Sequence, residues 1–287
     1  MVCMKDVNII IVNYKMKDDI EKCLVSLFAG IKASGLDVQV TVVDNASGDG
    51  VEGMLKEKYV GANGRSPVQF IMNQKNIGFG KAQNVGMQSC TAKYYFALNP
   101  DTEFLPGTGI IKKLFDFMEE HPKIGIIGPK IVYPDGSLQS SCYRFPSFWQ
   151  PIFSRTKLGQ RKWGKKINEH FLMKDFNHNK TQPVDWIMGS AMFIRNEAIK
   201  QVGMFDDRYW MYAEDSDWCR RMWDAGWPVY YVHDIVIQHA HGRGSAKIPG
   251  VFKALIKNKL ARVHLLSWLK YMWKWRGTGK YYKSKKL

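Results

Sequence analysis

Hydrophobic and polar residues follow two different rhythms over the first hundred positions of the chain. Residues 18–33 and 81–88 carry apolar side chains at every third or fourth position, which predicts helices. Short continuous apolar runs, typical of strands buried on both faces, cover residues 7–12, 38–43, 68–72 and 94–98. This alternation predicts an α/β fold with a mostly parallel, Rossmann-like central sheet that is flanked by helices.

The pattern is less regular in the second half of the chain. Residues 145–183 are rich in proline, aromatic and basic residues, and loops of this length are usually functional or disordered. We therefore expect an irregular segment there that takes part in choosing the acceptor. The other expected elements are helices at 110–120, 197–202 and up to 225, and strands at 124–132, 186–195, 229–232 and 235–239.

Polar residues stand at the ends of the four strands expected in the first half. Asn13 and Tyr14 follow the first strand, Asp44 ends the second, residues 73–79 follow the third and residues 99–101 the fourth. Ligands of parallel sheets bind beyond the carboxyl ends of the strands. The sequence therefore predicts one ligand site that is built from these four clusters.

Two of the clusters suit a nucleotide. Asp44 can accept the imide N–H of uracil or thymine and Tyr14 offers a stacking face, although an Asp at a strand end also forms turns and caps. The loop from Asn76 to Asn84 contains two glycines and runs into a helix, which suits anion binding through backbone N–H groups. Its spacing is neither GxGxxG nor GxxxxGK, which argues against dehydrogenases and P-loop proteins.

Acidic residues and one histidine offer further chemistry. Asp101 follows a strand and a Pro turn, and one carboxylate with a diphosphate can hold Mg²⁺ or Mn²⁺, but Asn-Pro-Asp is also an ordinary turn. Glu214, Asp215 and Asp217 lie among aromatic residues before a helix. Acids there either cap the helix or raise one another's pKa and act as general bases. His239 is either a surface residue or a ligand that would favour Mn²⁺.

Positive charge is concentrated at the C-terminal end. The chain of 287 residues has a net charge of +16, yet no acidic residue follows Asp234, and 13 Lys and Arg lie between Arg243 and Lys286. Residues 246–287, which also carry several Trp and Tyr, predict a helical extension that contacts a membrane surface. Alternatively, its apolar residues pack on the rest of the chain or on a second subunit in a homodimer, or the tail only improves solubility.

The cysteines and the hydropathy of the chain indicate in which cellular compartment the protein works. The five cysteines are scattered and show no CxxC spacing, which favours reduced thiols in the cytosol. No apolar stretch approaches the roughly 18–20 residues of a membrane-spanning helix, and the run at 7–14 is too short for a signal peptide. We expect a cytoplasmic protein that is at most peripheral at the inner face of the cell membrane.

Several short motifs follow one another between residues 7 and 245. They are Ile11-Val-Asn-Tyr14, Val43-Asp-Asn-Ala-Ser47, Asn76-Ile-Gly-Phe-Gly80, Leu98-Asn-Pro-Asp-Thr102, Gly189-Ser-Ala-Met-Phe-Ile-Arg195, Gly203-Met-Phe-Asp206, Tyr212-Ala-Glu-Asp-Ser-Asp-Trp-Cys-Arg220 and a strand ending in His239. As an ordered set they resemble the inverting family 2 glycosyltransferases, most of all the rhamnosyltransferase-type branch. The triplet Asn99-Pro100-Asp101 departs from a full DxD motif, because Asn99 replaces its first carboxylate.

The resemblance implies a GT-A fold, a UDP- or dTDP-sugar donor, a Mg²⁺ or Mn²⁺ cofactor, and inverting transfer to a glycan or lipid-linked acceptor in cell-surface polysaccharide or glycolipid assembly. It implies that Asp215 is the catalytic base and that Asp101 and His239 serve the metal. Residues 1–245 would be the catalytic domain, with a nucleotide-binding half (1–105) and an acceptor-binding half (106–245), and 246–287 the extension. Expected on the donor side are Val12, Asn13, Tyr14, Asp44, Asn76, Gly78, Phe79, Asn84, Asn99 and Asp101, and on the acceptor side Trp186, Gly189, Glu214 and Asp217.

Two other classes of protein, a sugar-phosphate nucleotidyltransferase and a non-catalytic nucleic-acid-binding protein, would share part of this pattern. A sugar-phosphate nucleotidyltransferase could share the sheet and the metal site, but it would normally carry a Gly-rich loop after the first strand, where this chain has Asn13-Tyr14-Lys15. A non-catalytic nucleic-acid-binding protein would explain the basic, aromatic tail. It would not explain the polar clusters at the strand ends, so no nucleic-acid partner is expected.

Overall fold

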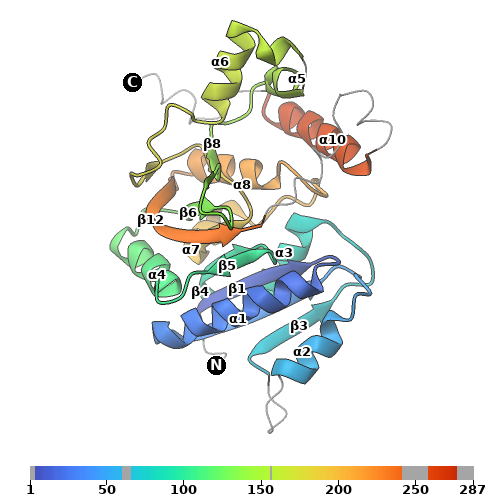
Figure 1. Cartoon of the computed structure of the whole chain (residues 1–287), viewed down its shortest axis with the longest axis vertical. Helices are drawn as coiled ribbons and strands as arrows, with labels where there is room; N and C mark the ends of the chain where they lie inside the picture. The colour runs from blue at the N-terminus through green and yellow to red at the C-terminus, as the bar shows by residue number, and fades with distance from the viewer. Residues whose placement is uncertain (1–3, 60–65, 156, 241–257, 277–287) are drawn as a thin grey trace.

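A mixed sheet of ten strands forms the centre of the molecule within the residues that the structure describes, 4–59, 66–155, 157–240 and 258–276 (Figure 1). The structure is a computed structural model. The strands of this sheet are β1 (Lys5–Asn13), β2 (Val38–Asp44), β3 (Val68–Met72), β4 (Ala92–Leu98), β5 (Thr102–Phe104), β6 (Ile126–Val132), β7 (Leu138–Gln139), β9 (Gln182–Pro183), β11 (Ala191–Arg195) and β12 (Val229–His239). Strands β8 (Cys142–Tyr143) and β10 (Trp186–Ile187) form a separate two-stranded sheet. The helices are α1 (Lys17–Ser34), α2 (Val51–Tyr59), α3 (Phe79–Gln88), α4 (Ile110–Glu120), α5 (Gln150–Arg155), η1 (Lys157–Gln160), α6 (Lys162–Phe171), α7 (Asn196–Val202), α8 (Glu214–Asp224) and α10 (Lys259–Lys274).

The N-terminal part of the sheet is parallel, as the sequence predicts. β1 pairs with β2 and with β4, and β2 pairs with β3, all in parallel. The strands and helices expected up to residue 120 are present, and their ends agree to within two residues. Helix α1 ends at Gly35, which adopts the left-handed conformation (φ 68°) that glycine tolerates without strain. Helix α2 was not expected, and it fills the crossover from β2 to β3.

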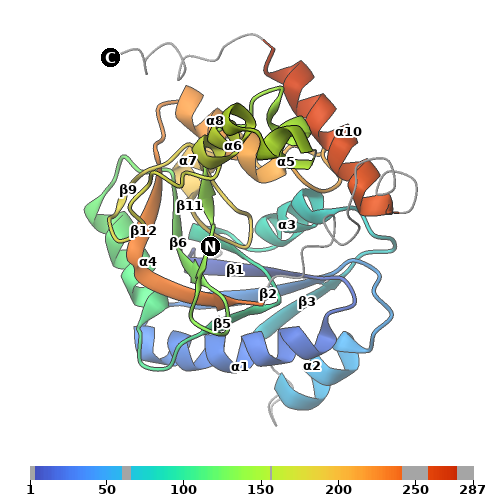
Figure 2. The same ribbon diagram turned by 45° about the horizontal axis from the view of Figure 1, so that its top comes forward.

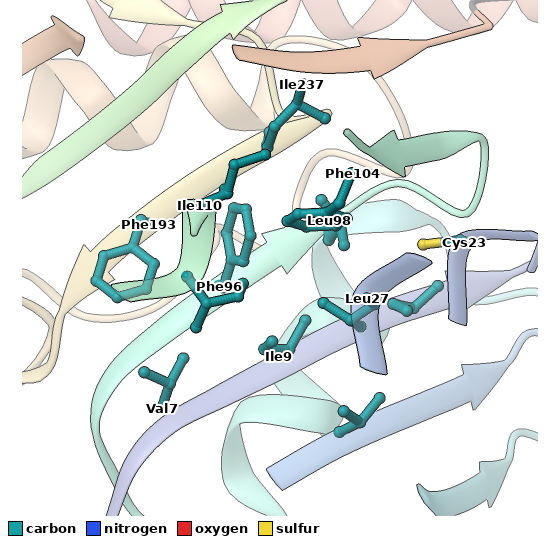
Figure 3. Packing of buried hydrophobic residues seen from close by; sticks show 14 of the residues in the cluster. Val7, Ile9, Cys23, Leu27, Phe96, Leu98, Phe104, Ile110, Phe193 and Ile237 are labelled. Atoms are coloured by element: carbon teal, nitrogen blue, oxygen red, sulfur yellow. The ribbon is translucent and has the colours of Figure 1, made fainter. Parts of the chain in front are cut away.

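Alternate residues of β1 enter two separate apolar layers. Ile9 and Ile11 pack in a layer with α1, α2 and α4, whereas Ile10 and Val12 pack in a second layer with α3, α7 and α8. Figure 2 shows α1 and α2 on one side of the sheet and α3, α7 and α8 on the other. Figure 3 shows the first layer, in which Phe96 of β4 lies near Phe193 of the adjacent β11. Both faces of the sheet are therefore covered, and polar side chains inside its strands, such as Asn8 and Thr41, are buried and hydrogen-bonded to each other.

The second half of the chain departs from the expected pattern in three places. The strand expected at 186–195 is divided into β10 and β11, and β11 runs antiparallel to both β4 and β6. The two strands expected at 229–239 are one strand, β12, with a shift in register between Val232 and Val236. The prediction of an irregular segment at 145–183 was wrong for residues 150–171, most of which are helical. Aromatic side chains such as Phe153 and Trp163, with ring centroids 4.8 Å apart, pack these short helices on one another.

Helix α10 (Lys259–Lys274) confirms that the described part of the basic extension is helical. Ser267 donates from its Oγ to the carbonyl of Met211 at 2.8 Å. Lys274 Nζ lies 2.7 Å from Asp206 Oδ2 and 2.8 Å from Asp217 Oδ2, so the end of α10 is bound to α8. The helix is therefore packed against the rest of the protein. Residues 246–257 and 277–287 of the extension lie outside the described residues.

The described helices include none that is both long enough and apolar enough to cross a bilayer. Cys23, Cys90, Cys142 and Cys219 have free thiols, as expected, and Cys3 lies outside the described residues. Burial raises the pKa of the Cys142 thiol to about 12, which makes it a weak nucleophile. These cysteines therefore contribute to packing rather than to chemistry.

Candidate active site

The carboxyl ends of β1 and β2 are joined by side-chain hydrogen bonds. Asn13 and Asp44 are opposite in register, and Asn13 Nδ2 donates to Asp44 Oδ1 at 2.8 Å. The same amide lies 3.1 Å from Ser47 Oγ and from Asp49 Oδ2, and the Ser47 N–H donates to Asp44 Oδ2 at 3.0 Å. Asp44 is held rigidly and keeps acceptor capacity on both oxygens. Tyr14, adjacent in the chain, is 45% exposed, as a stacking face requires.

The loop before α3 is fixed by Trp210. A Cβ atom at Gly78, where φ is +93°, would lie 2.1 Å from the Trp210 carbonyl oxygen, so only glycine fits. The Phe79 N–H donates to that oxygen at 2.9 Å, and the Gly78 N–H donates to Asn76 Oδ1 at 3.0 Å. These two N–H groups stabilise the loop itself. The anion binding expected from the sequence would therefore use the next N–H groups at the start of α3.

The turn at Asn99–Asp101 meets the end of β12. His239 Nε2 lies 3.1 Å from Asp101 Oδ1 and 3.4 Å from Asn99 Nδ2. The Ala240 N–H also donates to the Asp101 carbonyl at 3.0 Å, which joins the two segments through the backbone. The His239 side chain is 1% exposed and that of Asp101 is 12% exposed. The structure thus brings together three of the expected site residues from distant parts of the chain.

The Asp101 and His239 side chains fit a divalent cation that takes its remaining ligands from elsewhere. Neighbouring ligands of an octahedral Mg²⁺, each about 2.1 Å from the metal, are about 3 Å apart. The separation of Asp101 Oδ1 and His239 Nε2 is 3.1 Å. The described residues contain no cluster of three or more His, Cys, Asp or Glu side chains placed to hold a metal ion. The other ligands would therefore be substrate oxygens or water.

Asp215 is fixed at the start of α8. Its Oδ2 accepts the N–H of Gly189 at 3.0 Å, and its Oδ1 accepts the N–H of Ser216 at 2.7 Å. Tyr212 and Ala213, just before the helix, have φ values of 70° and 69°. Non-glycine residues adopt this conformation at a cost, and such residues are concentrated at functional sites. The two backbone N–H groups fix the direction of the Asp215 carboxylate.

Two consecutive residues connect Asp215 with the Asn99–Asp101 turn. Gly189 donates to Asp215, and the carbonyl of Ser190 accepts the Asn99 N–H at 2.8 Å. Both residues stand just before β11, which pairs directly with β4. The expected base and the expected metal ligand consequently belong to one site.

Burial sets the protonation of the carboxyl groups at the start of α8. It raises the pKa of Asp215 from its usual 3.8 to about 6, while the N–H groups of Gly189 and Ser216 oppose this rise by stabilising the charge. Burial and then the Asp215 charge hold the pKa of Glu214 well above its usual value. With a pKa of about 6, Asp215 is mostly ionised near neutral pH. A carboxylate with a pKa close to the working pH suits a general base.

Two expected site residues have structural roles in this arrangement. Asn84 Nδ2 donates to the Phe205 carbonyl at 2.8 Å and its Oδ1 accepts the Phe205 N–H at 3.0 Å, so the side chain clamps a loop. Asp217 is fully buried and accepts from Lys274 and from Trp275 Nε1, the latter at 2.9 Å. Its carboxylate therefore binds α10, and neither residue is brought to the Asp101–Asp215 region.

Two more expected residues lie beside the site. Trp186 stacks on Tyr143, with ring centroids 4.6 Å apart, and its Nε1 donates to the Arg144 carbonyl at 2.9 Å. Trp186 and Tyr143 thus form an aromatic stack, and Trp186 precedes Gly189 by three residues in the chain. Val12 is 7% exposed and packs in the second apolar layer, so only its backbone can meet a ligand.

The structure adds residues that the sequence analysis missed. Asp49 and Asp19 both line an open cavity of about 330 Å³ next to β1. Burial and then the charge of Asp101 raise the pKa of the Asp19 carboxyl. Asp19 therefore lies near the Asn99–Asp101 turn. Gln139 Oε1 lies 2.6 Å from His239 Nδ1. A buried Gln beside apolar strand residues was the available signal for this last contact.

The comparison with protein families gives the class of the protein. The family described as Glycosyl transferase family 2 matches residues 8–203, more than half of the chain. This chain therefore belongs to glycosyl transferase family 2 and is a glycosyltransferase. The matched segment includes Asp44, Asp101 and Gly189, and it ends before Asp215.

Individual relatives sharpen this assignment. The chain is 30% identical over 257 residues to the N-acetylglucosaminyl-diphospho-decaprenol L-rhamnosyltransferase of Mycobacterium tuberculosis, covering 82% of this chain and 77% of that protein. It is 28% identical over 218 residues to the dTDP-rhamnosyl transferase RfbF of Shigella flexneri, covering 74% and 63%. Among solved structures it resembles the mannosyltransferase PcManGT from Pyrobaculum calidifontis in complex with GDP-Man and Mn²⁺, with a TM-score of 0.56, 16% identity, and coverage of 84% of this chain and 59% of that chain.

The likeness in structure confirms the expected GT-A fold. The family and the relatives confirm the expected glycosyltransferase class. The two alternatives, a nucleotidyltransferase and a nucleic-acid-binding protein, find no support in these comparisons.

Proposed function

We propose that this glycosyltransferase moves a rhamnosyl group from dTDP-rhamnose to a hydroxyl of a lipid-linked sugar, with inversion at the anomeric carbon, in polysaccharide assembly. The donor and the acceptor class are inferred from the names of the relatives in Mycobacterium tuberculosis and Shigella flexneri. The observation that carries the proposal is the setting of Asp215. It is a partly buried carboxylate with a pKa of about 6, held by two backbone N–H groups, and two residues connect it with the Asn99–Asp101 turn.

The proposed reaction is a single displacement. Asp215 takes the proton of the acceptor hydroxyl while that oxygen bonds to the anomeric carbon. The bond from this carbon to the diphosphate breaks on the opposite face, and its electron pair leaves with the nucleoside diphosphate. Asp44 and Tyr14 bind the base of the nucleotide. Mg²⁺ or Mn²⁺ held by Asp101 and His239 would neutralise charge on the departing diphosphate.

The test is an assay of purified protein with dTDP-rhamnose and a polyprenyl-diphosphate-linked N-acetylglucosamine, in the presence of Mn²⁺ or Mg²⁺. We expect rhamnosyl transfer, and NMR of the product should show the inverted anomer. Asp215→Asn should lower kcat by a factor of about 10²–10⁴ and leave dTDP binding nearly unchanged. Asp234→Asn, an exposed acid on β12, is the control. Near-normal turnover by Asp215→Asn, or retention of configuration, would contradict the mechanism.

We also propose that the outer face of α10 lies on the membrane that carries such an acceptor. Ala261, Ser267 and Tyr271 are buried, whereas Leu266 and Trp273 are 56% and 69% exposed. Together with Leu265 and Leu269 these last two form an exposed apolar stripe, and basic residues border it. The exposed Lys259, Arg262, Lys270 and Arg276 suit an anionic lipid surface.

Vesicle flotation of the full-length protein tests this face. We expect binding to vesicles that contain phosphatidylglycerol, and loss of binding in the double variant Leu266→Glu, Trp273→Glu. Val25 of α1 is 64% exposed on a different helix, so Val25→Glu is a matched control and should bind normally. Equal flotation of the double variant and the wild type would reject the proposal.

A further inference from the structure

Gln139 holds His239 through both its backbone and its ring. Gln139 Nε2 donates to the His239 carbonyl at 3.3 Å, and Gln139 Oε1 lies 2.6 Å from His239 Nδ1. The two side chains are 3% and 1% exposed. Only the NH₂ group of an amide can donate to a carbonyl, so the first contact fixes which end of the amide faces the ring. The Gln139 oxygen therefore faces Nδ1, and Nδ1 must carry the proton.

This proton placement determines the state of the other ring nitrogen. A neutral imidazole with a proton on Nδ1 has a lone pair on Nε2. That nitrogen faces Asp101 Oδ1 at 3.1 Å and the amide nitrogen of Asn99 at 3.4 Å. A lone pair opposite a carboxylate oxygen is unfavourable unless a proton or a cation lies between them. The buried geometry is thus matched to a cation that both residues bind.

A tight hairpin places Gln139 for this contact. The Tyr133 N–H donates to the Ser137 carbonyl at 2.8 Å, and Gly136 has φ +81°. Asp135 Oδ1 accepts the Ser137 N–H at 2.9 Å, which stabilises the turn. The hairpin sets Gln139 opposite Ile131 of β6, and β6 also pairs with β12, the strand of His239. A buried amide is costly unless it is hydrogen-bonded, and here His239 is its partner.

We propose that Gln139 is a positioning residue that fixes His239 in the Nδ1–H form, so that Nε2 is presented to the divalent cation shared with Asp101. The inference rests on the proposed metal role of Asp101 and His239. In metal sites, a partner that binds the far nitrogen of a ligating histidine orients the ring and increases its basicity. Gln139 has this role without contacting the metal or the substrate.

The first test measures Mn²⁺ binding by calorimetry in the presence of saturating dTDP. Gln139→Leu removes the acceptor and should raise the Kd for Mn²⁺ by about 10- to 100-fold. Gln139→Glu keeps an acceptor for the Nδ1 proton and should remain within a few-fold of the wild type. Gln83→Leu replaces another fully buried glutamine, on α3, and is the control for general effects of such a change. A wild-type Kd in folded Gln139→Leu would overturn the inference.

The second test determines by NMR which ring nitrogen of His239 carries a proton in the metal-free wild type. Long-range ¹H–¹⁵N NMR distinguishes the two forms of a neutral histidine, and the His239→Ala spectrum identifies the His239 signals. We expect a proton on Nδ1, with or without a second proton on Nε2, and observation of a proton on Nε2 alone would overturn the inference even if Gln139→Leu fails to fold.

His239→Ala separates the failure of this inference from that of the metal site. If Mn²⁺ binding survives His239→Ala, the proposed metal site itself is wrong. If His239→Ala loses Mn²⁺ and folded Gln139→Leu keeps it, only the role of Gln139 is wrong.

Discussion

Replacing Asp215 with Asn should stabilise the protein at neutral pH while removing its activity. The folded protein raises the pKa of this carboxyl from 3.8 to about 6, mainly because the side chain is buried. At 1.36 kcal/mol for each pH unit, the charged form costs the folded state roughly 3 kcal/mol. Asn carries no charge and can still accept one of the two N–H groups, so Asp215→Asn should recover about 1–3 kcal/mol at pH 7.

The gain in the free energy of unfolding that Asp215→Asn produces should depend on pH. A carboxyl with a raised folded pKa contributes stability that is fully present below pH 3.8 and lost as the pH rises through about 6. The free energy of unfolding of Asp215→Asn should therefore exceed that of the wild type by an amount that grows between pH 4 and pH 7. Below pH 4 the two proteins should be nearly equal, because Asp215 is then protonated in both states.

Urea unfolding at pH 4, 5, 6 and 7 measures this difference. Asp234→Asn, an exposed acid, should show little change in the same series. A difference between Asp215→Asn and the wild type that stays constant from pH 4 to pH 7 would refute the raised pKa. The same pKa predicts that wild-type kcat falls about tenfold for each pH unit below 6, since only the ionised carboxylate can accept the proton.

Three further substitutions test residues that hold the loops and helices around the site in place. Gly78→Ala should lower stability by at least about 2 kcal/mol in urea unfolding, because the added Cβ meets a backbone oxygen at a positive φ. Asn84→Ala should cost about 2–4 kcal/mol, since both backbone groups of Phe205 lose their partner, with an unchanged Kd for dTDP by calorimetry. Lys274→Met should lower the thermal midpoint and cost about 2–4 kcal/mol, because it removes a cation from the buried Asp217.

The parallel part of the fold could be predicted from the sequence because its signals are local. The apolar runs at 7–12 and 94–98 are buried along their whole length, and each is followed at once by a polar residue, Asn13 or Asn99. The segment at 145–183 could not be predicted, since its helices are short and depend on aromatic contacts such as Phe153 with Trp163. Helix propensity alone is a weak guide for segments of this length.

The site was predictable to the extent that its residues follow strand ends or belong to the family motifs. The meeting of Asp101 with His239 confirms one such expectation of proximity. The acidic run at 214–217 did not reveal which carboxylate faces the site, because that depends on how α8 packs. Asp215 and Asp217 point to different partners, Gly189 for the first and α10 for the second. Gln139 was missed because its partner is 100 positions away in the chain.

Gly189 and Ser190 connect Asp215 with Asn99, and this connection affects how acceptor specificity can change in this family. In the proposed mechanism Gly189 and Ser190 would act as a fixed spacer between the proton acceptor and the leaving-group site, since one binds Asp215 and the other Asn99. The reacting centre therefore keeps its dimensions when surrounding segments are exchanged. Replacing 145–183 with the equivalent segment of a relative should change the preferred acceptor and leave the slow hydrolysis of the donor sugar by water unchanged.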